Sequence, residues 1–195
     1  MKLDKLTPLC KLAYKYGTDK CPQIRHLYTL VYYELLKDKK DIKKVLEMGI
    51  GCYFTMFKGY KTGASLYMWR DYFPNAHIYG ADNMPRTIFA RDRITTLLCD
   101  ETKEEDLKKL INYVGADIDL FIDDGSHKAE HQIFMCKTVM PLLKKDVIYI
   151  IEDIINEQAI VDALPEYDCE VIKISSILKK EHLKDNEILI RVKNL

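Results

Sequence analysis

The sequence predicts a doubly wound α/β fold. We expect one mostly parallel, seven-stranded sheet with helices on both faces and a closing C-terminal β-hairpin. Short apolar runs alternate with longer amphipathic segments, which is typical of strands joined by right-handed helical crossovers. DLFID and VIYIIED are almost continuously apolar, as in strands buried on both sides. The last two apolar runs, CEVIKIS and NEILIRVK, have only the short connection 181–186 between them, which predicts the hairpin.

The chain has 195 residues, a length that suits a single domain over residues 1–195. Residues 1–42 are expected to form an N-terminal helical extension, in which 23–36 place apolar side chains on one helical face. Residues 43–195 are expected to form the Rossmann-like core. Its predicted strands are 43–49, 76–82, 94–100, 117–123, 147–153, 169–175 and 186–193, and its predicted helices are 63–73, 103–114, 128–143 and 156–164.

Composition excludes several classes of function. Thirty basic residues balance thirty acidic ones, whereas a general nucleic-acid binder needs a net basic surface. No apolar run approaches the roughly 18 residues of a membrane span, and the N-terminus does not resemble a signal peptide. The six cysteines are scattered singly without zinc-ligand spacing, so we interpret them as reduced thiols of a cytoplasmic protein.

Each of the five predicted parallel strands ends at carboxylates. In open α/β sheets, ligands bind outside the carboxyl ends of the strands near the switch point of the topology. Asp and Asn also favour strand ends and helix caps for structural reasons alone, so any single position is ambiguous. The repetition at five strand ends favours a site. The residues concerned are Glu47, Asp82, Asn83, Asp100, Asp123, Asp124, Glu152 and Asp153.

The first strand runs into a glycine turn that departs from the dinucleotide-binding pattern. Gly49 and Gly51 are present, but Phe54 stands where a third glycine would be, and the next helix begins only near residue 63. This open turn suits a cofactor without phosphates, with Glu47 near a cationic amino-acid end. Asp82 is placed to bind a ribose hydroxyl pair, and Asp100 to face an adenine amine.

Five stretches carry a resemblance to a known family. They are KYGTDK (15–20), VLEMGIG (45–51), GASLYMWRDYFPNAHIYGAD (63–82), FIDDGSHKAEHQ (121–132) and YIIEDI (149–154). The chain resembles class I S-adenosylmethionine-dependent methyltransferases. Within that class it is similar to the magnesium-dependent macrolide (mycinamicin-type) sugar O-methyltransferases. The resemblance implies S-adenosyl-L-methionine and Mg²⁺ as cofactors and a sugar hydroxyl as the methyl acceptor.

The resemblance also implies a role for individual residues. Asp124, Glu152 and Asp153 would hold Mg²⁺, which prefers oxygen ligands, and His127 would be the general base. Asp123 is expected at the methionine end of the cofactor or behind the metal ligands. KYGTDK would fold over the cofactor pocket. Tyr16, Thr18 and Asp19 would be its nearest residues, His131 and Glu130 would be supporting residues, and Met68 and Trp69 would belong to the core.

The acceptor stays open at the level of sequence. From the short length we expect a site without the additional N-terminal domain of some relatives, which suits a nucleotide-linked sugar, a glycan end or a site completed by a second copy in a homo-oligomer. Methylation of a catechol-like small molecule would use the same metal chemistry. A catalytically silent S-adenosylmethionine-binding protein is a further alternative, which the set Asp124, His127, Glu152 and Asp153 disfavours. Neither charge nor basic-aromatic clusters support RNA as a substrate.

Overall fold

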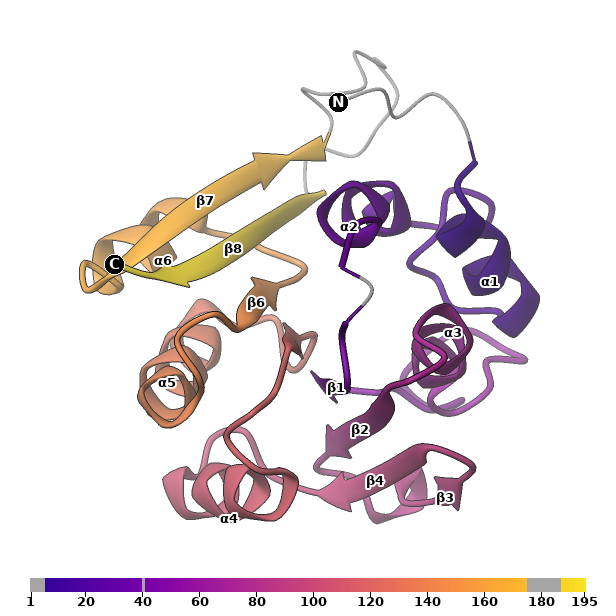
Figure 1. Ribbon diagram of the computed structural model, residues 1–195, viewed down its shortest axis with the longest axis horizontal. Helices are drawn as coiled ribbons and strands as arrows, with labels where there is room; N and C mark the ends of the chain where they lie inside the picture. Colours follow the sequence, from indigo (N-terminus) through magenta and orange to yellow (C-terminus); the bar gives the residue numbers. More distant parts are fainter. Residues whose placement is uncertain (1–5, 40, 175–186) are drawn as a thin grey trace.

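Eight strands form one sheet in the order β3-β4-β2-β1-β5-β6-β8-β7 (Figure 1). The computed structural model describes residues 6–39, 41–174 and 187–195. Neighbouring strands from β4 to β6 are parallel, and β8 lies antiparallel between β6 and β7. The strands are β1 Lys44–Met48, β2 His77–Asp82, β3 Ala90–Arg91, β4 Ile94–Leu98, β5 Leu120–Asp123, β6 Ile148–Ile151, β7 Tyr167–Lys173 and β8 Ile188–Asn194.

This sheet confirms the predicted doubly wound fold and the closing hairpin, with two differences. The eighth strand is the two-residue β3, which pairs antiparallel with β4 and is too short to leave an apolar pattern. The last strand β8 inserts between β6 and β7, an order that the chain sequence alone does not encode. The predicted hairpin connection, residues 181–186, lies outside the described residues.

Helices cover both faces of the sheet, as predicted (Figure 1). The first three pack on one face and the last three on the other, and two short 3-10 helices cover Pro85–Thr87 and Met140–Leu142. The helices are α1 Pro8–Tyr16, α2 Tyr28–Leu36, α3 Ala64–Tyr72, α4 Glu104–Val114, α5 Ala129–Val139 and α6 Glu157–Ala163.

The predicted helix over 23–36 begins only at Tyr28. Tertiary hydrogen bonds engage the backbone before it. The His26 amide donates to the Asp19 carbonyl (2.8 Å), and the Leu27 amide donates to the Glu187 carboxylate (2.8 Å). Because the amides of His26 and Leu27 donate to partners outside a helix, residues 23–27 do not form the first turns of the predicted helix.

Alternation along the central strands divides the core into two layers. Val45 packs with α1–α3, and the next residue, Leu46, packs with α4–α6. In β5, Ile122 belongs to the first layer and Phe121 to the second. Successive side chains of a strand point to opposite faces, so a strand covered on both sides must be apolar at nearly every position.

The strand order determines where a ligand site is expected in this sheet. From β1 the chain proceeds outward to β2 and β4, and it then returns to the other side of β1 for β5 and β6. The carboxyl ends of β1 and β5 therefore lie side by side at the switch point. The Asp124 amide holds these two ends together by donating to Met48 O (2.9 Å), and the Gly49 amide ties the end of β1 to β2 by donating to Ala81 O (2.8 Å).

Gly49 is required by this close approach. Its φ is +79°, and a β-carbon there would stand 2.0 Å from the Asp124 carbonyl oxygen. Gly17 has nearly the same φ, +76°, but open space around it. We expect Gly49→Ala to lower the free energy of unfolding by about 3 kcal/mol or more and Gly17→Ala by about 1–2 kcal/mol. Urea titrations of both variants check this, and equal losses would contradict the steric argument.

Asp119 joins the entry of β1 to the entry of β5. Its carboxylate accepts hydrogen bonds from the amides of Lys43 (2.6 Å) and Lys44 (2.9 Å) and from the Lys144 ammonium. Burial acts to raise the pKa of Asp119, but these donors lower it overall. Because the pKa of Asp119 is lower in the folded protein, its ionised carboxylate stabilises the fold at pH values above the unfolded-state pKa, which is near 3.9. This stabilisation is lost as the pH falls through the folded-state pKa.

We therefore expect Asp119→Asn to cost about 1–3 kcal/mol of unfolding free energy at pH 7. The difference from the parent chain should shrink in acid. Asp117→Asn is a suitable control, because the Asp117 side chain is exposed although it pairs with Lys44. Urea titrations at several pH values would test this, and a difference independent of pH would contradict it.

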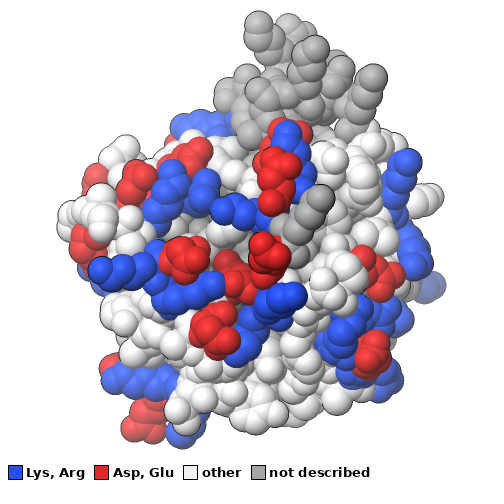
Figure 2. Space-filling model, in the orientation of Figure 1, with Lys and Arg blue, Asp and Glu red and all other residues white. Residues whose placement is uncertain are grey.

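Charges on the surface are mixed in sign. Figure 2 shows acidic and basic side chains interspersed on one face, in keeping with the balanced charge of the chain. Within the described residues, no helix is both long and apolar enough to cross a membrane. The six cysteines are free thiols, and five of them are buried.

Candidate active site

A cavity of about 840 Å³ opens at the carboxyl ends of the parallel strands. It is bounded by the segment between α1 and α2, by the glycine turn after β1, and by the residues that follow β2, β4, β5 and β6. Nine residues predicted from the sequence line it: Asp19, Gly49, Gly51, Asp82, Asn83, Asp124, His127, Glu152 and Asp153. The fold thus brings together side chains that are up to 134 positions apart in the chain.

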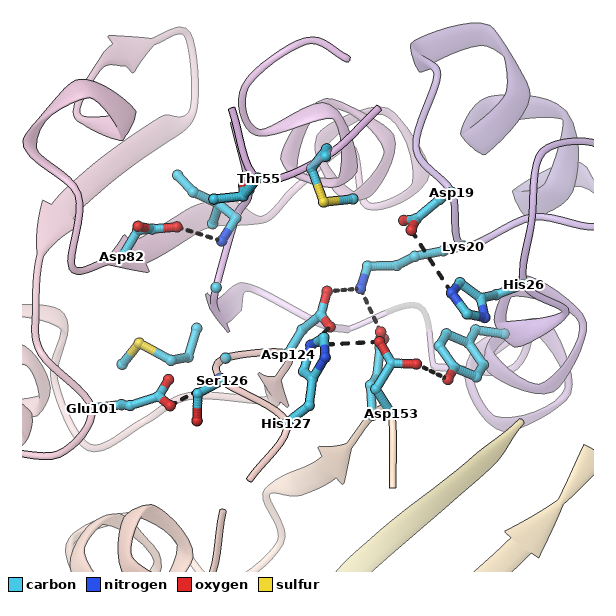
Figure 3. A pocket seen from close by; sticks show the side chains of 18 of the residues that line it. Asp19, Lys20, His26, Thr55, Asp82, Glu101, Asp124, Ser126, His127 and Asp153 are labelled. Atoms are coloured by element: carbon cyan, nitrogen blue, oxygen red, sulfur yellow. Dashed lines mark hydrogen bonds and ion pairs between the residues drawn. The ribbon is translucent and has the colours of Figure 1, made fainter. Parts of the chain in front are cut away.

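Asp124, His127 and Asp153 form the one group of described residues able to hold a metal ion. One potential ligand atom from each lies within 4.8 Å of the other two. His127 Nε2 is 3.2 Å from Asp124 Oδ1 and 3.5 Å from Asp153 Oδ2 (Figure 3). All three side chains are only partly buried, so the group is open to the cavity. Two carboxylates and one imidazole are a donor set that suits a divalent cation.

The backbone at this group is strained. His127 has φ +60° and Asp153 has φ +51°, and Arg93 is the only other non-glycine residue with positive φ among those described. The left-handed region is costly for residues with a β-carbon, although Asn and Asp adopt it more readily. Strained residues cluster at functional sites, where the surrounding structure holds them in place. Each of these two residues lies just beyond the end of a parallel strand, where the chain turns sharply.

The two carboxylates control the protonation of His127. Burial alone would lower the pKa of this imidazole, but the hydrogen bond and charge of Asp124, together with the charge of Asp153, raise the pKa of His127 to about 9. In the metal-free protein at neutral pH, His127 is therefore an imidazolium between two carboxylates.

A second cation, Lys20, enters the same acid cluster from the N-terminal segment. Its Nζ donates to Asp124 Oδ2 (2.5 Å) and to Glu152 Oε2 (2.5 Å), and lies 3.5 Å from Glu47 Oε1. Figure 3 shows the side chain extending toward Asp124. Lys20 is only 2% exposed. Burial acts to lower the pKa of Lys20, but the neighbouring carboxylates raise it, so the side chain stays charged.

Two tyrosines of α2 position the carboxylates that follow β6. The Tyr28 hydroxyl donates to Asp153 Oδ1 (2.6 Å), and the Tyr32 hydroxyl donates to Glu152 Oε1 (2.5 Å). Glu152 therefore has both oxygens engaged, one by Tyr32 and one by Lys20. Glu152 lies outside the group formed by Asp124, His127 and Asp153, and its role as a metal ligand stays a prediction.

Asp82 and Asn83 line another part of the cavity, after β2. Asp82 Oδ1 accepts from the Met84 amide (2.9 Å) and Oδ2 from the Ile50 amide (3.2 Å). Each carboxylate oxygen has a second lone pair, so this side chain can still accept two hydroxyl donors. Burial raises the pKa of Asp82 despite these hydrogen bonds.

Asp100 does not line the cavity, whereas its neighbour Glu101 does. The Asp100 carboxylate accepts from the Thr102 amide and hydroxyl, and the pKa of Asp100 is lowered to about 2 by these bonds and by Lys103. Glu101 instead accepts from the Ser126 amide (2.9 Å). Gly125 makes room for it, since a β-carbon there would lie 1.8 Å from Glu101 Oε2. The residue that lines the cavity is thus the one after Asp100. Because β4 ends at Leu98, the turn that follows it, and not the alternation of a strand, determines where the side chains of residues 100 and 101 point.

Four other predicted cofactor contacts also lie away from the cavity. Glu47 is fully buried and accepts from Ser65 Oγ (2.7 Å) and Trp69 Nε1 (2.7 Å). Asp123 points into the layer under α5, because period two places it on the same face as Phe121; burial raises its pKa. The remaining two are Tyr16, whose hydroxyl donates to Asp71, and Thr18, which is fully buried.

The core positions of Met68 and Trp69 are confirmed, whereas the supporting roles of His131 and Glu130 stay predictions. His131 Nδ1 lies 2.7 Å from Ser126 Oγ and 3.7 Å from Glu101, beside the cavity rather than in the metal-binding group. Glu130 is 3.8 Å from His131 Nε2. Met68 and Trp69 are fully buried in the core. The sequence interpretation missed Lys20, Tyr28, Tyr32 and Glu101, although Lys20 stands within the quoted KYGTDK.

Comparison with known proteins identifies relatives of this chain. No family model matches it. Over 147 residues, 75% of this chain and 36% of the relative, it is 35% identical to the 8-demethyl-8-(2-methoxy-alpha-L-rhamnosyl)-tetracenomycin-C 3'-O-methyltransferase of Streptomyces olivaceus. Over 146 residues, 74% of this chain and 35% of the relative, it is 33% identical to the mycinamicin VI 2''-O-methyltransferase of Micromonospora griseorubida. The matched segment thus spans about a third of the length of these relatives.

Solved structures share the fold. The MycE methyltransferase of the mycinamycin biosynthetic pathway, in complex with Mg, SAH and mycinamycin VI, matches with a TM-score of 0.71. The sequences are 25% identical, and the match covers 97% of this chain and 56% of that one. A crystal form of the same enzyme with Mg and SAH matches equally well at 24% identity.

Proposed function

Because this chain has the class I methyltransferase fold and is a homologue of sugar O-methyltransferases, we propose that it transfers a methyl group from S-adenosyl-L-methionine to a sugar hydroxyl with the help of Mg²⁺. The observation that carries the proposal is the cluster of Asp124, His127 and Asp153 at the strand ends, in the same cavity as the glycine turn and Asp82. Cofactor elements and a cation-binding group with a base therefore share one cavity.

The cofactor half of the cavity fits a nucleoside without phosphates. Gly49 and Gly51 bring backbone rather than side chains to the cavity wall, and Asp82 retains acceptor capacity for a ribose hydroxyl pair. We assign Asn83 and Glu101 to the same half, Glu101 in place of the predicted Asp100. Asp19 lies near Lys20 at the other side of the cavity.

The cation half fits Mg²⁺ through the carboxylates of Asp124 and Asp153, since Mg²⁺ prefers oxygen ligands and keeps positions for water or substrate. When bound, the cation would orient and acidify an acceptor hydroxyl and neutralise the carboxylates that now raise the pKa of His127. His127, beside both carboxylates, would then be a neutral imidazole able to accept the hydroxyl proton at Nε2. Asp124 and Asp153 also hold the imidazole in place.

For the acceptor we propose a sugar, either nucleotide-linked or at the end of a glycan or glycoside. Vicinal sugar hydroxyls can bind a cation and present one oxygen to the methyl donor. Two relatives from Streptomyces olivaceus are named as O-methyltransferases of rhamnosyl tetracenomycin-C. The polar residues Arg25, His26 and Glu187 also line the cavity and are suitable for hydroxyl groups. The buried free thiols suit our assignment to the cytoplasm.

Calorimetry and a methyl-transfer screen test this function. The purified chain should bind S-adenosylhomocysteine, and labelled S-adenosylmethionine should methylate one member of a panel of nucleotide sugars, rhamnosides and catechols only with Mg²⁺ present. Absence of cofactor binding would overturn the proposal. Labelling of a catechol alone would replace the sugar with a phenol, and full activity after chelator treatment would remove the cation from the mechanism.

A further inference from the structure

We propose that Lys20 is an internal counterion that occupies part of the cation site, competes with the divalent ion for Glu152, and so keeps the ion weakly bound in the protein without substrate. This inference rests on the proposed function, because it concerns the cation-binding half of that cavity. It assigns a positioning role to a residue outside the metal-binding group. The argument depends on contacts, burial and charge.

The first step is the way the donors of Lys20 are used. An ammonium has three N–H donors. Two of them are directed at Asp124 Oδ2 and Glu152 Oε2 at 2.5 Å, and the third direction is toward Glu47, 3.5 Å away. The side chain is 3% exposed, so water cannot replace these partners. Lys20 is thus built into the acid cluster by three carboxylates from β1 and from the turns after β5 and β6.

The second step is the balance of charge around the cavity floor. Glu47, Asp124, Glu152 and Asp153 bring four carboxylates together, and of the described residues only Lys20 and His127 form ion pairs with them. Burying several like charges without counterions is strongly unfavourable. In the protein without a metal ion, Lys20 therefore keeps Asp124 and Glu152 close to each other.

The third step is what remains for a divalent ion. Asp124 Oδ2 and both oxygens of Glu152 accept from Lys20 or Tyr32, so an ion can reach Asp124 Oδ1 and Asp153 Oδ2, the two oxygens that face His127, without displacing Lys20. Glu152 can join the ion only when it exchanges its Lys20 partner. Lys20 also repels a dication directly. Both effects weaken binding, and both depend on the same ammonium.

A consequence for the reaction follows. An ion held weakly by the protein gains its remaining ligands from the acceptor hydroxyls, so it binds tightly only together with an acceptor. Lys20 would in this way couple occupation of the cation site to the presence of substrate.

A manganese-binding experiment tests the role of Lys20 without any acceptor. Mn²⁺ is a spectroscopic substitute for Mg²⁺ at carboxylate sites, and its free concentration is read from its paramagnetic resonance signal. We expect Lys20→Met to bind Mn²⁺ at least about tenfold more tightly than the parent chain, because the competing charge is removed. We also expect a lower melting temperature without metal and a larger rise in melting temperature on adding Mg²⁺.

A double-mutant cycle isolates the competition for Glu152. If Lys20 weakens the ion by holding Glu152, most of the gain in affinity should disappear in Lys20→Met/Glu152→Gln. Lys44→Met is the matched control: Lys44 also donates to a carboxylate at 2.5 Å, that of Asp117, but near the amino end of β1. This variant should leave Mn²⁺ affinity unchanged.

Three results would overturn the inference. Mn²⁺ affinity of Lys20→Met could be equal to or weaker than that of the parent chain. The gain could persist in the double variant, which would leave only nonspecific charge repulsion. Lys20→Met could stay unfolded in millimolar Mg²⁺, which would show that the ammonium is a packing element that the ion cannot replace. Failure of the proposed function has a different signature, namely a parent chain that does not bind S-adenosylhomocysteine.

Discussion

Replacing His127 with asparagine should lower methyl transfer by about 100-fold or more, the range expected when a general base is removed, and should leave the affinity for S-adenosylhomocysteine nearly unchanged. The imidazole is the one nitrogen base in contact with both Asp124 and Asp153 among the described residues, and Figure 3 shows it apart from Asp82. Asparagine is preferred to alanine because it tolerates φ +60° more readily, so the turn should survive. The measurement combines single-turnover methyl transfer with calorimetry.

His77→Asn is the matched control for this variant. His77 opens β2, and its Nε2 lies 2.9 Å from Thr95 Oγ1, at the other end of the strand from the cavity. Its replacement should leave turnover unchanged. If His127→Asn were as active as the parent chain, His127 would not be the base. If both variants lost activity equally, the loss would reflect stability rather than chemistry.

Replacing Asp153 with asparagine should raise the Mg²⁺ concentration needed for half-maximal turnover by about tenfold or more. The change removes one of two carboxylate charges from the cation group, although the amide oxygen remains a weak ligand. Asparagine keeps the acceptor for the Tyr28 hydroxyl and tolerates φ +51°. The altered property is therefore charge rather than geometry. Turnover measured across a Mg²⁺ series, at saturating cofactor, gives the midpoint.

Asp162→Asn provides the comparison. Asp162 lies on α6, accepts from Gln158 Nε2 (2.7 Å) and does not line the cavity. Its Mg²⁺ midpoint should match that of the parent chain. If the Mg²⁺ midpoint of Asp153→Asn also matched that of the parent chain, the ion would bind elsewhere. The affinity for S-adenosylhomocysteine should be unaffected in both variants.

Lys20 connects these two predictions to the N-terminal segment. If the ammonium holds Asp124 and Glu152 together before the ion binds, the segment between α1 and α2 acts on the cation site through one side chain. Tyr28 and Tyr32, which follow in α2, act on Asp153 and Glu152 through their hydroxyls. Helix α2 and the segment before it therefore contact the acid cluster as well as covering the sheet.

The main architecture and the site residues at the strand ends could be predicted from local sequence. Buried strands must be apolar at nearly every position, so DLFID and VIYIIED are recognisable without a structure. Parallel strands deliver their carboxyl ends to one edge, so Asp82, Asp124 and Asp153 could be expected around one cavity. His127 could be placed with them because it follows Asp124 by only three residues.

Tertiary structure alone decided the rest. Lys20 is 104 positions from Asp124, and no local period encodes a contact at that separation. The direction of a side chain beyond the end of a strand depends on the turn, which is why Glu101 rather than Asp100 faces the cavity. The alternation of side chains along β5 determines which face of the sheet Asp123 lies on, but only the packing of α5 shows that this face is buried. Sequence determined which chemical groups the strand ends carry, and the packing of distant segments determined which of them meet.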